Sequence, residues 1–491
     1  MYATTVYVIS IGCVFLLWVF FTAGLATVLS VYKAFISTAY NHLARQTPQL
    51  LRGNTNVTRT EALLYLVYII GNIIAVFVED LTRKGIQSRA GFLALINMAP
   101  LVLVGRPNSL VNSYMISQRT QERLHTVIGY MVLVQSVIHT AIGISMNQNQ
   151  RSFTGYLAVG GITFLCVFMA KFCRSLAFEA FRALHVLVAL LVLVSLSLHV
   201  QITRIPLLRT GPSICVFVIV ALWAALIVFR VVRSIFSSLG ARAYVIGHEK
   251  DDGIVQIVVD FRNPWFKFQP GQFMYITIPS ISSSAVLQSH PFQLVWWDQP
   301  LSRAFFLVRP GKGFTRNLLH HRSAWMSRGE STEDPIMMAT TLRTIVEGPY
   351  GLSDLKLGSY GTVLMVATGL GIASQLPYIK HLLDAHHSRS VTTQKIKLFW
   401  EVQMEGHRHW VSRWMAELMK ADLDHILSIS IFITKNADFS GLLMQEVTNR
   451  VGDIIITVCA KNDTKRDIRT RIGASLGGGV VLKELDFEPS E

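Results

Sequence analysis

Residues 123–140 read RLHTVIGYMVLVQSVIHT, and residues 181–200 read FRALHVLVALLVLVSLSLHV. Both stretches are apolar, and each carries two histidines that are 14 residues apart: His125 with His139, and His185 with His199. On an α-helix this spacing makes almost four turns, so the histidines of one stretch lie near one face, about 21 Å apart along the axis. Two such helices side by side would present two stacked pairs of imidazoles.

The stacked pairs predict two haems, one above the other. A haem iron with two axial imidazoles has no open position, so it carries electrons. Because the sequence contains no C-x-x-C-H run, we expect no covalent c-type attachment. The alternative is four unrelated histidines that hydrogen-bond to neighbouring helices. We favour haem ligation, because the spacing occurs twice and ionisable groups in lipid are usually functional.

The composition indicates a membrane protein with a soluble tail. Of the 491 residues 51% are hydrophobic, and the apolar surplus lies in the first half. The net charge of +15 does not indicate nucleic-acid binding, because many basic residues flank the apolar segments and no basic-aromatic motif is present in the sequence. The five cysteines form neither a disulfide framework nor a metal-binding pattern.

Seven apolar segments predict seven membrane spans, at about 5–31, 60–79, 90–105, 124–145, 154–172, 181–202 and 212–232. Placing the C-terminus in the cytosol puts eleven flanking Lys and Arg residues there and six outside, which favours this orientation. Both histidine helices then run outward, pairing His125 with His185 on the inner side and His139 with His199 on the outer side. Electrons could therefore cross the membrane from inside to outside.

The soluble half predicts two further domains. From about residue 240, short apolar runs alternate with turn residues, which indicates a small antiparallel β-barrel. From about residue 360, strand and helix patterns alternate, which is typical of a doubly wound α/β domain on a parallel sheet. We therefore divide the chain into a transmembrane haem domain (1–238), a β-barrel domain (239–356) and an α/β domain (357–491).

Two glycine-bearing loops are candidates for binding phosphate. Residues 309–315, RPGKGFT, are basic and precede a helix-like stretch. Gly369-Leu370-Gly371 lies between an apolar strand and a helix, the position of a dinucleotide-phosphate loop, although a tight turn is the alternative. Cys459 ends a later parallel strand, where such sheets bind ligands; inert packing is the alternative there.

With these residues in view, the chain resembles the fungal ferric-chelate reductase family, whose relatives include the membrane NADPH oxidases. The similarity extends from about residue 60 to 490. It is carried by the two histidine spans and by SRAGFLALINMAPLVLVGRPNSL (88–110), AFEAF (177–181), PGQF (270–273), HPF (290–292), GKGFT (311–315), EGPYG (347–351) and ATGLGIA (367–373).

The resemblance implies a route for electrons. NADPH would give a hydride to FAD in the barrel, and single electrons would pass through two b-type haems to ferric or cupric chelates outside. This activity belongs to iron or copper uptake, at the plasma membrane and with a possible metal permease as partner. The family pattern assigns FAD contacts to His290, Pro291, Phe292, Gln293, Arg309, Gly311, Gly313 and Thr315, and NADPH contacts to Gly369, Gly371 and Cys459.

The chain departs from the family pattern at three places. Gln293 stands where the family usually has Ser or Thr, Ala373 replaces a Thr, and Cys459-Ala460-Lys461 replaces Cys-Gly-Pro. Two alternatives to a metalloreductase are kept: a superoxide-generating NADPH oxidase with the same cofactors, and a non-catalytic haem-binding relative, for which these departures are the evidence.

Overall fold

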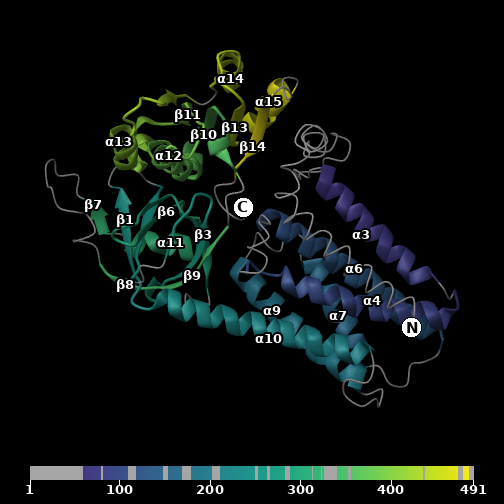
Figure 1. Ribbon diagram of the computed structural model, residues 1–491. Helices are drawn as coiled ribbons and strands as arrows, with labels where there is room; N and C mark the ends of the chain where they lie inside the picture. Colours follow the sequence, from purple (N-terminus) through teal and green to yellow (C-terminus); the bar gives the residue numbers. More distant parts are fainter. Residues whose placement is uncertain are drawn as a thin grey trace. The chain divides into compact units, whose positions relative to one another are not determined.

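The computed structural model (Figure 1) forms two compact units, Met1–Phe229 and Arg230–Glu491. Each unit is described by itself. The structure describes residues 59–78, 81–108, 118–146, 153–168, 178–201, 211–248, 253–262, 266–281, 288–311, 313–321, 323–325, 340–351, 355–434, 437–473 and 479–485.

The described part of the first unit is helical. Its helices are α3 (Arg59–Phe77), α4 (Arg83–Leu103), α6 (Gln118–Ser145), α7 (Phe153–Phe168), α9 (Phe178–Gln201) and the start of α10 (Gly211–Ser238). Six of the seven predicted segments are thus helices, and the segment 5–31 lies outside the described residues. Among the residues that the structure describes, four helices are long and apolar enough to cross a membrane: Arg83–Leu103, Gln118–Ser145, Ala180–Val200 and Gly211–Ser238. A total of seven spans stays a prediction.

Helix α4 begins seven residues earlier than the apolar pattern predicts, at Arg83 rather than at residue 90. Thr82 caps it, since its hydroxyl accepts a hydrogen bond from the backbone N–H of Gly85 (3.1 Å). Inside the helix, Arg89 is buried, and its Nε donates to the carbonyl oxygen of Val76 (3.0 Å). From hydropathy alone, Arg89 is placed outside the apolar segment as a flanking charge. The pattern cannot show that Arg89 has a hydrogen-bond partner on another helix.

Polar side chains join three helices of this unit. Asn97 on α4 donates to Oδ1 of Asn72 on α3 (2.7 Å) and to Oε1 of Gln135 on α6 (2.9 Å). The hydroxyl of Tyr68 donates to Oδ1 of Asn97 (2.8 Å). Because Asn72, Asn97 and Gln135 are each only 1% exposed, these bonds satisfy groups that would otherwise be costly in an apolar layer.

The second unit contains two sheets in the region predicted to be a barrel. One has the order β5-β6-β2-β1-β7, with β8 also paired to β1; the other has the order β4-β3-β9. The strands are β1 (Arg242–His248), β2 (Val255–Asp260), β3 (Phe273–Thr277), β4 (His290–Gln293), β5 (Trp296–Asp298), β6 (Arg303–Val308), β7 (Ser323–Trp325), β8 (Leu342–Arg343) and β9 (Ile345–Tyr350). Their pairings are antiparallel except β1 with β7, which is parallel. Closure into a barrel stays a prediction.

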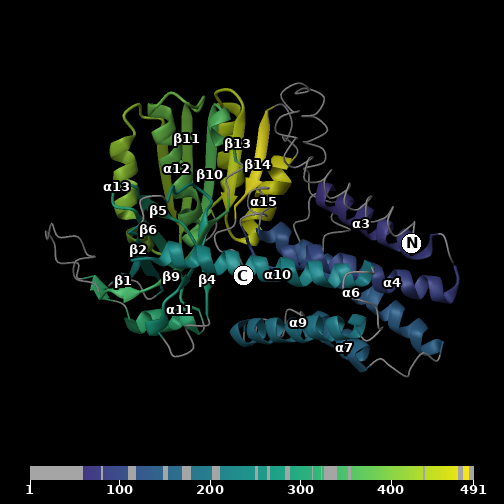
Figure 2. The same ribbon diagram turned by 60° about the horizontal axis from the view of Figure 1, so that its bottom comes forward.

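The rest of the second unit is a doubly wound α/β fold, as predicted (Figure 2). Its five strands are all parallel in the order β12-β11-β10-β13-β14: β10 (Thr362–Thr368), β11 (Lys395–Val402), β12 (Leu427–Ile433), β13 (Ile454–Cys459) and β14 (Val480–Glu484). Side chains of α12 (Ile372–His387) and α13 (Ser412–Ala421) pack in one core cluster, and those of α14 (Phe439–Thr448) and α15 (Asn462–Gly473) in another. Strand order reverses between β10 and β13, and ligands of such sheets bind at this reversal.

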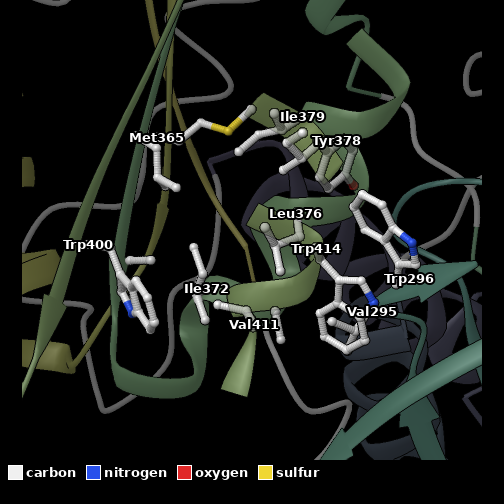
Figure 3. Close-up of a cluster of buried hydrophobic side chains, with 14 of the residues drawn as sticks. Val295, Trp296, Met365, Ile372, Leu376, Tyr378, Ile379, Trp400, Val411 and Trp414 are labelled. Carbon is white, nitrogen blue, oxygen red and sulfur yellow. The ribbon is translucent and has the colours of Figure 1, made fainter. Parts of the chain in front are cut away.

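One hydrophobic core joins the antiparallel region to the α/β region. The ring of Trp296 on β5 stacks on Trp414 of α13 with ring centres 6.0 Å apart, and Phe305 of β6 meets Trp414 edge-on. Figure 3 shows Trp296 and Trp414 beside Leu376 and Tyr378 of α12. The ammonium of Lys380 covers the ring of Trp296 from 5.0 Å. The antiparallel region and the α/β region are therefore packed as one unit.

Ion pairs join α14 to the first residues of β11. Glu446 forms ion pairs of 2.7 Å with both Lys395 and Lys397. Burial acts to raise the pKa of Glu446, but the hydrogen bonds and charges of the two lysines outweigh it, so the pKa lies below its ordinary value. The carboxylate therefore stabilises the fold above the pKa that it has when unfolded, and this contribution is lost as the pH falls through the lower folded-state pKa.

We predict that Glu446→Gln lowers the free energy of unfolding of this unit by about 1–3 kcal/mol at pH 7, because hydrogen bonds to charged groups are worth that much. The deficit should shrink at pH 4, which is below the ordinary carboxyl pKa of 4.5, because the unfolded wild-type chain then binds a proton that the folded carboxylate resists. Thermal unfolding at both pH values measures this. The control is Glu417→Gln, which removes an exposed pair with Arg413 and should cost less than about 1 kcal/mol. A deficit that does not change with pH would contradict the assignment.

Candidate functional site

The structure brings the four predicted histidines together in two pairs across α6 and α9. The ring centres of His125 and His185 are 6.1 Å apart, and those of His139 and His199 are 6.4 Å apart. These are the pairings expected from parallel helices with equal spacing. In the described residues, no cluster of three or more His, Cys, Asp or Glu side chains could hold a metal ion.

The spacing of the rings fits two axial ligands of one iron. A metal–imidazole bond is about 2.0 Å long, and the ring centre lies about 1.1 Å beyond the bonded nitrogen. Two opposed ligands would thus have ring centres about 6.3 Å apart. Both pairs agree with this value within a few tenths of an ångström. The donors are imidazoles alone, the set that makes a coordinatively closed haem iron.

The residues assigned to flavin lie on β4, on the loop before α11 (Phe314–Asn317) and, for Thr315, in α11 itself, and the structure places β4 against the start of α11. The ring of His290 stacks on Phe314 with centres 4.5 Å apart, and the ring centre of Phe292 is 6.5 Å from that of Phe314. Gln293 ends β4 opposite Phe273, and Pro291 lies opposite Tyr275. The rings of His290 and Phe292 therefore form one cluster with Phe314, and Pro291 and Gln293 alternate with them along β4.

The glycine-bearing loop itself is open to solvent. Arg309, Gly311 and Gly313 are exposed, and the backbone N–H of Gly311 donates to the hydroxyl of Thr315 (2.9 Å). Gly313 has φ +65°, a conformation that favours glycine. Exposed backbone next to a guanidinium is chemistry that suits a diphosphate.

The residues assigned to the nucleotide lie at the carboxyl ends of β10 and β13, where the strand order reverses. Gly369 follows β10 with φ +52°, and a Cβ placed on it would have no atom within 4 Å. A Cβ on Gly371 would instead overlap the carbonyl oxygen of Cys459 at the end of β13. Gly369 thus borders open space. Gly371, in contrast, lets the turn after β10 lie directly against the end of β13.

Two further side chains at this edge, Trp400 and Glu401, were missed by sequence reasoning. The indole N–H of Trp400 donates to the carbonyl oxygen of Gly369 (2.8 Å), which holds the glycine loop to β11. Glu401, 3% exposed, accepts a hydrogen bond from the backbone N–H of Ala437 and lies 3.9 Å from the ammonium of Lys461. The sequence shows both residues at a strand end, but only the fold shows their partners.

The departures from the family pattern fit their surroundings. Ala373, in the first turn of α12, is fully buried in the core, where a hydroxyl would need a partner. The backbone N–H of Lys461 donates to the hydroxyl of Thr368, which precedes Gly369 (3.0 Å). Lys461 therefore helps to join the ends of β10 and β13.

Comparison with known families matches three successive parts of the chain. Residues 90–196 match the ferric reductase like transmembrane component, residues 241–354 an FAD-binding domain, and residues 360–466 the ferric reductase NAD binding domain. The matched residues include three of the four paired histidines, His125, His139 and His185. They also include both glycine loops and Cys459.

Among curated proteins, the chain is 25% identical over 354 residues to "Probable cell surface ferric reductase kap2" of Aspergillus oryzae, covering 66% of this chain and 44% of that protein. It is 24% identical over 373 residues to "Probable ferric reductase transmembrane component" of Candida albicans, covering 73% and 50%. Human NADPH oxidase 3 is 27% identical over 206 residues, covering 39% and 32%. The chain spans about half the length, or less, of these curated relatives.

Among solved structures, the flavohemoglobin of Malassezia yamatoensis aligns with a TM-score of 0.37 and 12% identity, over 82% of this chain and 98% of that one. By its three domain matches and these curated proteins, the chain is similar to ferric reductases of fungi and, over a shorter stretch, to an NADPH oxidase.

Proposed function

We propose that the protein is a transmembrane NADPH-dependent metalloreductase that passes electrons through two b-type haems to ferric or cupric chelates on the far side of the membrane. The observation that carries this proposal is the facing of His125 with His185 and of His139 with His199, at ring distances of 6.1 and 6.4 Å. Two closed haem sites in one helix pair serve electron transfer across a membrane better than they serve the binding of a substrate.

The chain's own residues would align the cofactors. His125 with His185, and His139 with His199, would each hold one haem, which would supply single-electron transfer. His290, Pro291, Phe292 and Gln293 would contact FAD, with Arg309, Gly311, Gly313 and Thr315 at its phosphates. Gly369, Gly371 and Cys459 would contact NADPH. FAD, when bound, supplies the conversion of a hydride into single electrons.

The orientation follows from the basic residues that flank the helices. With the soluble unit in the cytosol, His125 and His185 lie on the inner side, and His139 and His199 lie on the outer side. Such a protein belongs in the plasma membrane, where metal chelates reach it from outside and a metal permease could take up the reduced ion.

A superoxide-generating oxidase is the second candidate. Its support is the similarity to human NADPH oxidase 3 and to the heavy chain of a superoxide-generating NADPH oxidase of Dictyostelium discoideum. The two candidates differ in the acceptor. Sealed vesicles that enclose NADPH and FAD, with a membrane-impermeant ferric chelate outside, should form ferrous ion whether or not superoxide dismutase is present. Ferrous ion that disappears when the dismutase is added would point to the oxidase.

We predict that His139→Ala removes the outer haem and leaves the inner one, because a single imidazole does not make a closed axial pair. Reduction of the external chelate should fall by more than about 10-fold, as expected when a metal site is disrupted. Pyridine haemochrome analysis and the vesicle assay measure the two effects. Unaltered haem content together with unaltered chelate reduction would overturn the haem assignment.

We predict that Gly369→Ala raises the KM for NADPH about 10-fold, the effect of losing about 1.4 kcal/mol of binding free energy. The new methyl group would meet no protein atom within 4 Å, so only a bound nucleotide would be displaced. Steady-state reduction of a soluble acceptor measures KM. The control is Gly452→Ala, since Gly452 has a similar φ of +65° but precedes β13 at the opposite edge of the sheet. Equal KM values for the two variants would contradict the placement.

A further inference from the structure

Helix α4 contacts both histidines of α6 in the same way. The Nδ1 atom of His139 lies 2.9 Å from the carbonyl oxygen of Gln87, and the Nδ1 atom of His125 lies 3.2 Å from the carbonyl oxygen of Leu101. The two carbonyls are 14 residues apart on α4, as the two histidines are on α6. The helices α4 and α6 run in opposite directions, so the earlier carbonyl, that of Gln87, meets the later histidine, His139. The later carbonyl, that of Leu101, meets the earlier histidine, His125.

These contacts decide which nitrogen of each ring can bind iron. A carbonyl oxygen only accepts hydrogen bonds, so Nδ1 must carry the proton in both histidines. Nε2 is then left with its lone pair, which is the form that a metal needs. Histidines that bind metals generally donate their other ring N–H in this manner, which fixes the tautomer and the ring orientation.

A glycine follows each carbonyl by four residues, one turn further along the chain. A Cβ on Gly91 would lie 2.5 Å from Nδ1 and 2.9 Å from Cε1 of His139, which is closer than real atoms approach. A Cβ on Gly105 would lie 3.6 Å from Cε1 of His125, an ordinary contact. The outer histidine therefore needs a glycine beside it, and the inner histidine has room for a methyl group.

The histidines of α9 differ from those of α6. Within the described part of the chain, Nδ1 of His185 is buried and has no hydrogen-bond partner. The ring of Phe181, one turn earlier on α9, lies 6.0 Å away instead. In the inner pair, the α6 ring is thus held by a directional bond, and the α9 ring is held by packing.

We propose that α4 is the supporting helix of both haem sites: it sets the tautomer of His125 and His139 through two backbone carbonyls, and Gly91 is a positioning residue that makes room for the ring of His139. This rests on the proposed function, because it assumes that His139 binds haem. It goes further by assigning a role in haem binding to residues that do not touch the iron.

The test is Gly91→Ala in the full-length, detergent-solubilised protein, with haem content and the low-spin signals in electron paramagnetic resonance as readouts. Without haem the ring of His139 can turn away from the new methyl group, so the helices can still pack. With haem the ring is fixed, and the methyl group overlaps it. We expect Gly91→Ala to lose the outer haem or to shift its low-spin signal, while the inner haem stays as in the wild type.

Two matched controls separate this effect from general packing of α4 on α6. Gly105→Ala places the same methyl group beside His125, where there is room, and should keep both haems. Gly143→Ala adds a methyl group on α6 one turn beyond His139, 2.7 Å from Nε2 of Gln87. That atom is the end of a flexible side chain and can move, so this variant should also keep both haems.

The outcomes distinguish this inference from the proposed function. If the wild type binds no haem, or His139→Ala loses none, the proposed function fails. If His139→Ala loses the outer haem but Gly91→Ala keeps both signals unchanged, the positioning role of Gly91 is wrong. Loss of both haems in Gly91→Ala, or an equal effect in Gly143→Ala, also overturns it, because the predicted overlap is with one ring only.

Discussion

The described part of the first unit depends on one constraint: two imidazoles face each other across α6 and α9, and they do so twice along the same pair of helices. Their ring centres are 6.1 and 6.4 Å apart, the separation that the haem sites we propose would require. Equal 14-residue spacing on α6 and α9 makes it possible, since parallel helices with equal spacing stay in register. The neighbouring helix α4 follows the same spacing with the carbonyls of Gln87 and Leu101. The same 14-residue interval therefore separates the contacting groups on α4, α6 and α9.

The second unit holds two candidate ligand-binding segments within one body. One is formed by β4 and the start of α11, and the other by the carboxyl ends of β10 and β13. The packing of Trp296 and Phe305 on Trp414 merges the antiparallel sheets and the α/β sheet into one core. At the nucleotide edge, Trp400 and Thr368 tie the glycine loop to β11 and to the end of β13. Apart from Thr368, which lies in the ATGLGIA stretch, these contacts are made by side chains outside the recognisable motifs. The motifs are therefore held in place by the rest of the sequence.

The sequence predicted those parts of the fold that show as a regular pattern of residue types along the chain. Hydropathy located six described helices, and strand–helix alternation predicted the parallel sheet. The histidine spacing predicted both pairs, because helical geometry converts a sequence interval directly into a face and a height. Other features show no such pattern. The start of α4 was missed because Arg89 finds its partner on another helix, and the parallel pairing of β1 with β7 breaks an otherwise antiparallel pattern. The contact between Gly371 and Cys459 joins residues far apart in the chain. Such features depend on which elements become neighbours.

The most direct test of the central claim is an absorption difference spectrum of the purified protein supplied with FAD, comparing reduction by NADPH with reduction by dithionite. The account predicts a low-spin b-type haem spectrum with dithionite, much of which NADPH also produces. Haem that dithionite reduces and NADPH does not would contradict the route through the soluble unit. A protein that binds no haem would contradict the role of the four histidines on which the account is built.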